Sequence, residues 1–144
     1  MAAERTWIID RSSLEAISPV SEAVRGLAEP VLGSDGASDV ELALVEAATN
    51  VVRHGYGPEG GPIRIEASKS AGGVVVRIFD WGQPIPGEAL AHAGLSRFDF
   101  DPTDLEVLPE GGMGLSLIAA VMDEVTYRSD EGQNILTLLR RARA

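Results

Sequence analysis

The sequence predicts an α+β fold, a two-layer sandwich in which one mainly antiparallel, mixed sheet is covered on one face by helices. Three observations lead to this prediction. Helical and strand patterns do not alternate strictly along the chain, which disfavours a sheet built from parallel βαβ units. Two pairs of strand patterns are each joined by a short turn, as in antiparallel hairpins. Two segments before the first hairpin carry apolar residues at helical spacing, so each has one face to bury.

The N-terminal part of the chain predicts an edge strand followed by a helical segment. Residues 5–9 form a short apolar run that favours an edge strand. Ser12 or Ser13 then starts an amphipathic segment that extends to about Ala28. Because proline disrupts the interior of a helix, Pro19 favours a turn followed by a helix within this segment.

A second helix is predicted over residues 41–56, after a loop over residues 29–38 that is rich in Pro, Gly, Ser and Asp. Asp39 is a suitable N-cap for this helix and Gly55 a suitable stop. Its apolar stripe includes Leu44, which lies about 200° around the helix from Glu46. One side of this helix can therefore pack on a sheet while the other lines a cavity.

The rest of the chain predicts two hairpins, a long loop and one short helix. The two hairpins are formed by strands at 63–68 with 74–79, and at 123–129 with 134–140. The segment at about 87–111 is long and weakly patterned, which in a compact domain marks a functional loop or disorder, and an apolar helix follows at 115–121. All of these elements fit one domain over residues 1–144.

Composition excludes several classes of function. The 144 residues carry a net charge of −10, which disfavours binding to nucleic acids or anionic membranes. The chain contains no cysteine, and no apolar run approaches the roughly 18 residues of a membrane span, so a soluble cytoplasmic protein is expected. A phosphate ligand remains compatible with this charge, because a metal ion, backbone N–H groups and a few local cations can hold it.

The first of three candidate motifs lies on the helix over residues 41–56. Glu46 and Asn50 are four residues apart and share a face, and Arg53 lies close to it. The amide oxygen of Asn50 is a suitable hard ligand for Mg²⁺. Glu46 can accept a proton from an attacking water or hydroxyl group.

The other two motifs follow in a fixed order. Asp80, at a strand end, can accept a hydrogen bond from an exocyclic amine and so distinguish adenine from guanine, and Gly82 lets a flat base approach the backbone. The helix that follows the long loop opens on Gly112 and Gly114, whose free N–H groups form a phosphate site. The loop at about 87–111 is then expected to be a lid over a nucleotide.

In this order, the segments ATNVVRHGY, DWGQP and GGMGLSLI resemble the ATPase fold shared by DNA gyrase, heat-shock chaperones, mismatch-repair ATPases and sensor histidine kinases. The chain looks most like the small stand-alone anti-sigma factor serine/threonine kinases, over nearly its whole length. Pro84, where gyrase-like members carry Gly, also fits that branch.

The resemblance implies ATP and Mg²⁺ as cofactors, with a protein serine or threonine as phosphate acceptor. It makes Glu46 the catalytic base and Asn50 the metal ligand. The expected partners are an anti-sigma factor antagonist as substrate, a sigma factor and a second copy in a homodimer. The residues expected at the nucleotide are Asn50, Arg53, Asp80, Gly82, Arg97, Gly112, Met113, Gly114 and Leu115.

Two departures from the family pattern keep alternatives open. Members often carry Thr early in the last strand, where this chain reads Gln133 and Asn134, and Asn134 is the candidate substitute. Arg97 is the only cation of the lid, which is otherwise acidic. The alternative function is a nucleotide-binding switch that sequesters a partner without phosphotransfer. The ATP-binding half of a two-component histidine kinase is a third reading.

Overall fold

The computed structural model describes residues 3–92, 97–99 and 112–143. Within these residues, one six-stranded sheet has the order β1-β2-β3-β6-β5-β4. The elements are β1 (Ala3–Ile9), α1 (Leu14–Asn50), η1 (Val51–Gly55), β2 (Ile63–Ser70), β3 (Gly73–Asp80), α2 (Gly87–His92), β4 (Arg97–Asp99), α3 (Gly112–Val121), β5 (Glu124–Asp130) and β6 (Gln133–Arg141).

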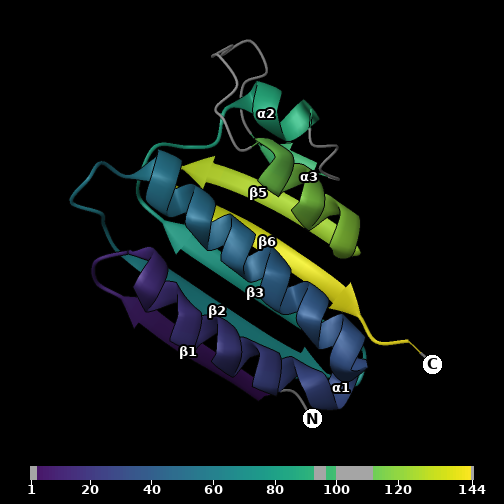
Figure 1. The fold of residues 1–144 in the computed structure, drawn as a ribbon. Coiled ribbons are helices and arrows are strands. Elements are labelled where there is room, and N and C mark those ends of the chain that lie inside the picture. The colour runs from purple at the N-terminus through teal and green to yellow at the C-terminus, as the bar shows by residue number, and fades with distance from the viewer. Residues whose placement is uncertain (1–2, 93–96, 100–111, 144) are drawn as a thin grey trace.

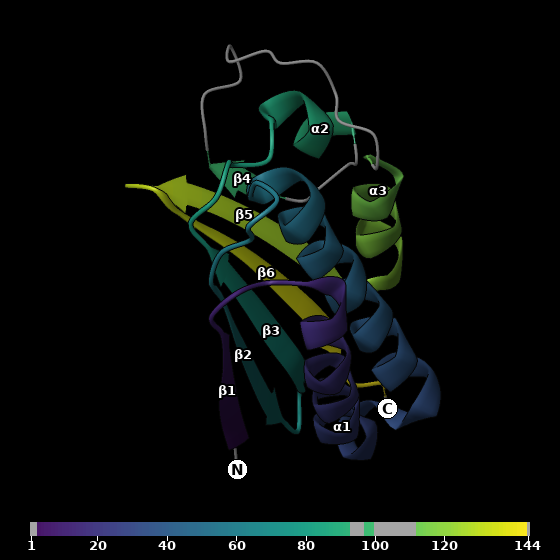
Figure 2. The same ribbon diagram turned by 60° about the vertical axis from the view of Figure 1, so that its left-hand side comes forward.

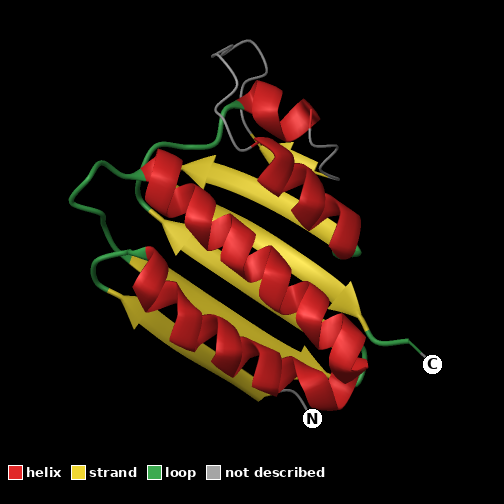
Figure 3. Cartoon of the chain, viewed as in Figure 1, coloured by secondary structure: helices red, strands yellow, loops and turns green. Residues whose placement is uncertain are grey.

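The layers are those that the sequence predicts. Helices α1 and α3 lie on the same side of the sheet in both views (Figures 1 and 2), and the red helices of Figure 3 cover that side. Only β4 among the described strands pairs in parallel, with β5, and the other neighbours are antiparallel. The predicted α+β sandwich with a mainly antiparallel, mixed sheet is confirmed.

The two predicted hairpins are present; β2, β3 and β6 are slightly longer than expected, and β5 is shifted by one residue. Alternate residues of β2, namely Ile63, Ile65 and Ala67, are fully buried beneath the helices. The β5–β6 hairpin turns at Glu131 and Gly132, whose φ angles are 52° and 82°. Two consecutive positive φ angles give a tight turn whose twist matches that of the strands, and Gly132 adopts this conformation at no steric cost.

Helix α1 begins where the sequence predicts but does not break at Pro19. The Ser13 hydroxyl caps it by accepting the Ala16 N–H at 3.1 Å. The prediction of a turn at Pro19 is wrong, since the helix continues through it. Ile17 and Val20, on either side, are 2% and 7% exposed, so packing on the sheet outweighs the one backbone hydrogen bond that proline cannot make.

The predicted loop over residues 29–38 is also wrong, because this stretch is helical except at one residue. Gly33 has φ 78° and ψ 177°, which divides α1 into two helices. Gly36 and Ala37 are buried just after the break, so tertiary packing overrides the turn-forming composition. The second helix therefore starts before Asp39, which is not its N-cap. At its other end, α1 changes at Val51 into the π-helical turn η1.

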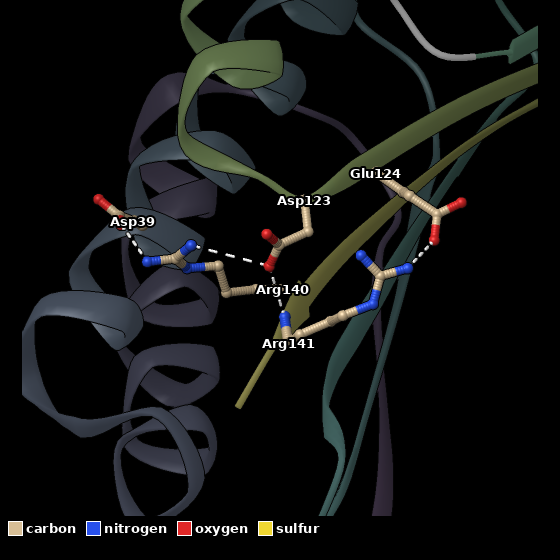
Figure 4. Close-up of polar contacts among 5 residues, drawn as sticks. All are labelled: Asp39, Asp123, Glu124, Arg140 and Arg141. Carbon is tan, nitrogen blue, oxygen red and sulfur yellow. Dashed lines mark hydrogen bonds and ion pairs between the residues drawn. The ribbon is translucent and has the colours of Figure 1, made fainter. Parts of the chain in front are cut away.

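Asp39 instead takes part in an ion network that joins α1 to the sheet (Figure 4). An Nη atom of Arg140 donates to Asp39 Oδ2 at 3.0 Å, and the other Nη lies 3.7 Å from Asp123 Oδ2. Asp123 Oδ2 also accepts the backbone N–H of Arg141 at 2.7 Å. The Arg140 side chain is only 12% exposed, so this network connects α1, β6 and the turn after α3 with little screening by water.

Replacing Arg140 with Met should lower the free energy of unfolding by about 1–2 kcal/mol, because two partly buried carboxylates lose their common partner. Urea titration followed by circular dichroism measures this loss. Arg141→Met is the matched control: its side chain is 57% exposed and pairs only with Glu124 among the described residues, so a change within about 0.5 kcal/mol is expected. Equal losses in the two variants would contradict this account of the network.

Candidate functional site

A cavity of about 160 Å³ opens where η1, the end of β3 and the start of α3 meet. Its wall combines apolar side chains with a few polar groups, the usual composition of a small-molecule site. The lining residues are Ala47, Asn50, Val51, His54, Gly55, Ile78, Asp80, Gln83, Pro84, Ile85, Pro86, Leu115, Tyr127 and Leu136.

The three sequence motifs come together at this cavity. Asn50, Asp80 and Leu115 line it, one from each motif. Gly114 connects the third motif to the first, since a Cβ atom placed on it would lie 3.0 Å from Glu46 Oε2 and 3.7 Å from Asn50 Oδ1. The backbone at the start of α3 therefore lies directly against the polar face of the Glu46 helix.

Asp80 is the last residue of β3 and is 6% exposed. Its Oδ1 accepts two hydrogen bonds, from the Gly82 N–H at 2.9 Å and from Asn134 Nδ2 at 2.8 Å. Burial raises the pKa of the Asp80 carboxyl, and these two hydrogen bonds partly oppose the increase. Within the described part of the chain no donor bonds its Oδ2, and the residue lines the cavity.

The loop after Asp80 is fixed because each of its backbone N–H groups has a partner. Pro84 and Pro86 have no N–H group to satisfy. The remaining donors and their acceptors are Trp81 to Tyr56 OH at 2.9 Å, Gly82 to Asp80 Oδ1 at 2.9 Å, Gln83 to Gly55 O at 2.6 Å, and Ile85 to Tyr127 OH at 2.9 Å. This wall of the cavity is therefore formed without a ligand.

Position 82 requires glycine because the backbone of Gly55 packs against it. A Cβ atom on Gly82 would lie 2.2 Å from the Gly55 carbonyl oxygen and 2.6 Å from its carbon. The backbone of Gly55 thus occupies the space on the Cβ side of Gly82. The predicted approach of a flat base to Gly82 stays a prediction. The two glycines thus let the end of η1 and the loop after β3 pack backbone against backbone.

Glu46 and Arg53 lie in a second hollow. This groove has a volume of about 380 Å³ and runs between the two halves of α1. The Glu46 carboxylate also approaches Gly114 beside the cavity. Glu46 therefore lies between the groove and the cavity. Arg53 lines the groove and is not among the residues that line the cavity. Its predicted contact with the nucleotide stays a prediction. The groove is lined by Leu14, Ile17, Ser18, Ser21, Val45, Glu46, Thr49 and Arg53.

The remaining predicted site residues are placed only by their backbone. Gly112 and Met113 are the first two residues of α3. Arg97 begins β4 and pairs with Thr126 of β5. The side chains of Arg97 and Met113 lie outside the described residues, as does most of the predicted lid, of which α2 and β4 are described. Their contacts with a ligand stay predictions.

Several residues of the site were not found from the sequence. Tyr127 lines the cavity and holds the loop through Ile85, and burial raises the pKa of its hydroxyl, which stays protonated. His54 also lines the cavity, at the end of the Glu46 helix. Period-two alternation in β5 would have placed Tyr127 on the helix-covered face, yet only strand pairing brings it to this loop. Trp81 is 42% exposed and lines a different hollow.

The donor set fits a metal ion that is shared with a phosphate ligand. No cluster of three or more His, Cys, Asp or Glu side chains suited to a metal occurs in the described segments. Asn50 faces the cavity, and its side-chain amide has no hydrogen bond to any described residue. Mg²⁺ is commonly held by one or two protein oxygens together with phosphates and waters, and Asn50 can supply one such oxygen.

Comparison with known protein families adds independent information. A family model described as a histidine kinase-like ATPase domain matches residues 11–140. In the same part of the chain that the structure describes, no helix is long and apolar enough to cross a membrane.

Named relatives include the serine-protein kinase RsbW of Bacillus mycoides (strain KBAB4) and that of Bacillus cereus (strain AH820). Each is 31% identical over 102 residues, which cover 71% of this chain and 62% of the relative. The chain therefore spans less than two thirds of the length of these proteins. These matches confirm the predicted resemblance to the serine/threonine kinase family.

Among solved structures, a crystal structure of the RsbU and RsbW domains of a Mycobacterium tuberculosis protein has the same fold. The TM-score is 0.64, with 97% of this chain and 33% of that chain covered, at 21% sequence identity. At this identity the likeness establishes the fold, and the chemistry must be argued from the site itself.

Proposed function

Since the chain belongs to the family of histidine kinase-like ATPase domains, we propose that it binds ATP in the cavity beside Asp80 and transfers the γ-phosphoryl group to a serine or threonine of a partner protein. The observation that carries this proposal is the convergence of Asn50, Asp80 and Leu115, which are far apart in sequence, on one cavity. The named relatives, which are serine-protein kinases, support the type of reaction.

The adenine end of the site is built around Asp80. Its Oδ1 is occupied by two N–H donors, and its Oδ2 remains to accept the exocyclic amino group of adenine. Apolar side chains from three elements, namely Val51, Ile78 and Leu136, offer surfaces against which a flat base can pack. Gly82 contributes by keeping the loop close to η1.

The phosphate end of the site lies at the start of α3. The N–H groups of a helix N-terminus favour an anion, and Gly112, Met113, Gly114 and Leu115 supply them here. Arg97 and Arg53 are the cations that we assign to the phosphates, Arg53 from the groove side. A bound Mg²⁺, held through Asn50, would neutralise phosphate charge and orient the phosphates.

We assign Glu46 the role of general base. The acceptor hydroxyl enters from the groove, and Glu46 takes its proton while the hydroxyl oxygen forms a bond to the γ-phosphorus. The bond between that phosphorus and the bridging oxygen breaks, so ADP leaves with the electron pair. Glu46 suits this step because its carboxylate contacts both the groove and the start of α3.

The acceptor we propose is an anti-sigma factor antagonist, with a sigma factor as the sequestered partner and a homodimer as the assembly. The observation behind these partners is the similarity to RsbW kinases, because no described residue identifies them. Phosphotransfer to a serine of a co-purified protein, detected by mass spectrometry after incubation with ATP and Mg²⁺, tests this part. Absence of transfer to every co-purified protein would overturn it.

Replacing Asp80 with Asn should lower ATP affinity by about a hundredfold, because a donor replaces the acceptor that faces the amino group. Isothermal titration calorimetry measures this loss. Stability should not fall with it, because the amide oxygen can still accept both existing hydrogen bonds.

The pKa of Asp80 gives the sign of the stability change that Asp80→Asn should cause. The folded-state pKa of Asp80 is raised, so the folded protein binds this proton more tightly and loses stability as pH rises through the interval above the usual pKa. At pH 7 the neutral variant lacks this cost and should unfold at an equal or higher urea concentration. Unchanged ATP affinity in a folded Asp80→Asn variant would contradict the assignment of Asp80 to the adenine-binding site.

A further inference from the structure

A chain of hydrogen bonds, buried at Asn134 and Asp80 and partly buried at Ser129, leads from the hairpin β5–β6 to Asp80. Asn134 is 1% exposed and lies directly opposite Asp80 in the β3–β6 register. Its Nδ2 donates to Asp80 Oδ1 at 2.8 Å and to the Gly82 carbonyl oxygen at 3.0 Å. Ser129, its neighbour in the β5–β6 register, donates its hydroxyl to Asn134 Oδ1 at 2.7 Å. Asn134 of β6 thus holds the carboxylate at the end of β3, and Ser129 of β5 holds Asn134.

This arrangement allows one orientation of the Asn134 amide. Its NH₂ group faces two acceptors, the Asp80 carboxylate and the Gly82 carbonyl, while its oxygen faces the Ser129 hydroxyl. A flipped amide would place its oxygen against both acceptors, and buried polar groups without partners are costly. Ser129 therefore fixes which end of the amide meets Asp80.

The fixed amide in turn determines what Asp80 presents to the cavity. Asn134 and the Gly82 N–H both bond Oδ1, so the carboxylate is held by one oxygen and its rotation is restricted. Oδ2, the oxygen without a hydrogen bond to a described residue, is left as an acceptor. An acceptor held in this position binds an amino group and repels a carbonyl oxygen.

We propose that Ser129 and Asn134 are positioning residues that set the specificity of the site for a 6-aminopurine over a 6-oxopurine. Asn134 acts by holding Asp80, and Ser129 acts by holding Asn134. This inference rests on the proposed ATP site and adds the residues that determine its choice of base. It also gives a structural reason why Asn at position 134 suits this chain.

The test compares ATP with two probes, GTP and purine riboside triphosphate, which differs from ATP only in lacking the 6-amino group. Calorimetric titration in Mg²⁺ buffer gives the dissociation constants. Wild-type protein should bind ATP roughly 10- to 100-fold more tightly than purine riboside triphosphate, the effect of one hydrogen bond to a charged acceptor, and should bind GTP more weakly than ATP. Asn134→Ala should reduce the first ratio to about threefold or less, and Ser129→Ala should give a ratio between these values.

Two controls separate positioning from general damage. Ser68→Ala removes a hydroxyl group from β2. Gln133→Ala shortens the residue next to Asn134, and the Gln133 side chain lines a different hollow. Both should keep the wild-type ratio. Thermal unfolding of each variant shows that it is folded, and if Asn134→Ala does not fold, Ser129→Ala decides the question.

The outcomes distinguish this inference from the proposal beneath it. A ratio that falls in Asn134→Ala and Ser129→Ala but not in the controls supports the positioning role. Folded variants that discriminate as strongly as wild-type protein would overturn it and leave the ATP site standing. Wild-type protein that binds none of the three triphosphates would overturn both.

Discussion

Replacing Glu46 with Gln should slow phosphotransfer by about 100- to 10,000-fold, the usual contribution of a general base. The amide has nearly the same shape but cannot take the proton of the acceptor hydroxyl. ATP affinity should be nearly unchanged, because Glu46 does not line the cavity that we assign to adenine. Single-turnover transfer of labelled phosphate to the acceptor protein measures the rate, and calorimetry measures the affinity.

Glu22→Gln is the control for this substitution, since Glu22 is an exposed residue of α1 whose side chain lines neither the cavity nor the groove. It removes the same charge and should transfer phosphate at the wild-type rate. If Glu46→Gln transfers phosphate as fast as Glu22→Gln, another group takes the proton, and Glu46 is not the general base.

Gly82→Ala should have the largest effect on the cavity itself. The new methyl group would lie 2.2 Å from the Gly55 carbonyl oxygen, a backbone atom that can move only with η1. Such overpacking costs about 1–3 kcal/mol of folding free energy. Because the same shift displaces the loop after Asp80, ATP binding should be lost even where the variant remains folded. Urea unfolding and calorimetry measure the two effects.

Gly26→Ala provides the matched comparison, because a Cβ atom there would have no neighbour within 4 Å. Gly26 lies within α1, so alanine should raise the free energy of unfolding by about 0.5–1 kcal/mol through helix propensity. If Gly82→Ala lowers the free energy of unfolding and Gly26→Ala raises it, the loss at Gly82 comes from the clash with Gly55 and not from replacing a glycine. Normal ATP binding by Gly82→Ala would contradict this account.

The sheet was predictable because its strands carry local signals. The alternation in β2 and the turn at Glu131 and Gly132 are written in adjacent residues. The middle of α1 was less predictable, since residues 29–38 have the composition of a loop and become helical through packing that involves residues distant in sequence. The place of Asp39 could not be found locally either, because its partner, Arg140, is 101 residues away.

The site was predictable in its parts and not in its construction. Glu46, Asn50 and Asp80 stand in recognisable motifs, and the structure brings them to one region. Nothing in the sequence shows that Gly55 fills the space beside Gly82, because that contact depends on how η1 meets the loop. Asn134 was a candidate from its position in the last strand, but its contact with Asp80 depends on the register between β3 and β6.

The most direct test of the central claim is a crystal structure of the protein with a non-hydrolysable ATP analogue and Mg²⁺. We expect the 6-amino group at Asp80 Oδ2, the phosphates at the N-terminus of α3 beside Gly114, and the metal ion on the Asn50 side-chain oxygen. An analogue bound elsewhere on the molecule, or bound in the cavity with its phosphates against Asp80, would contradict it.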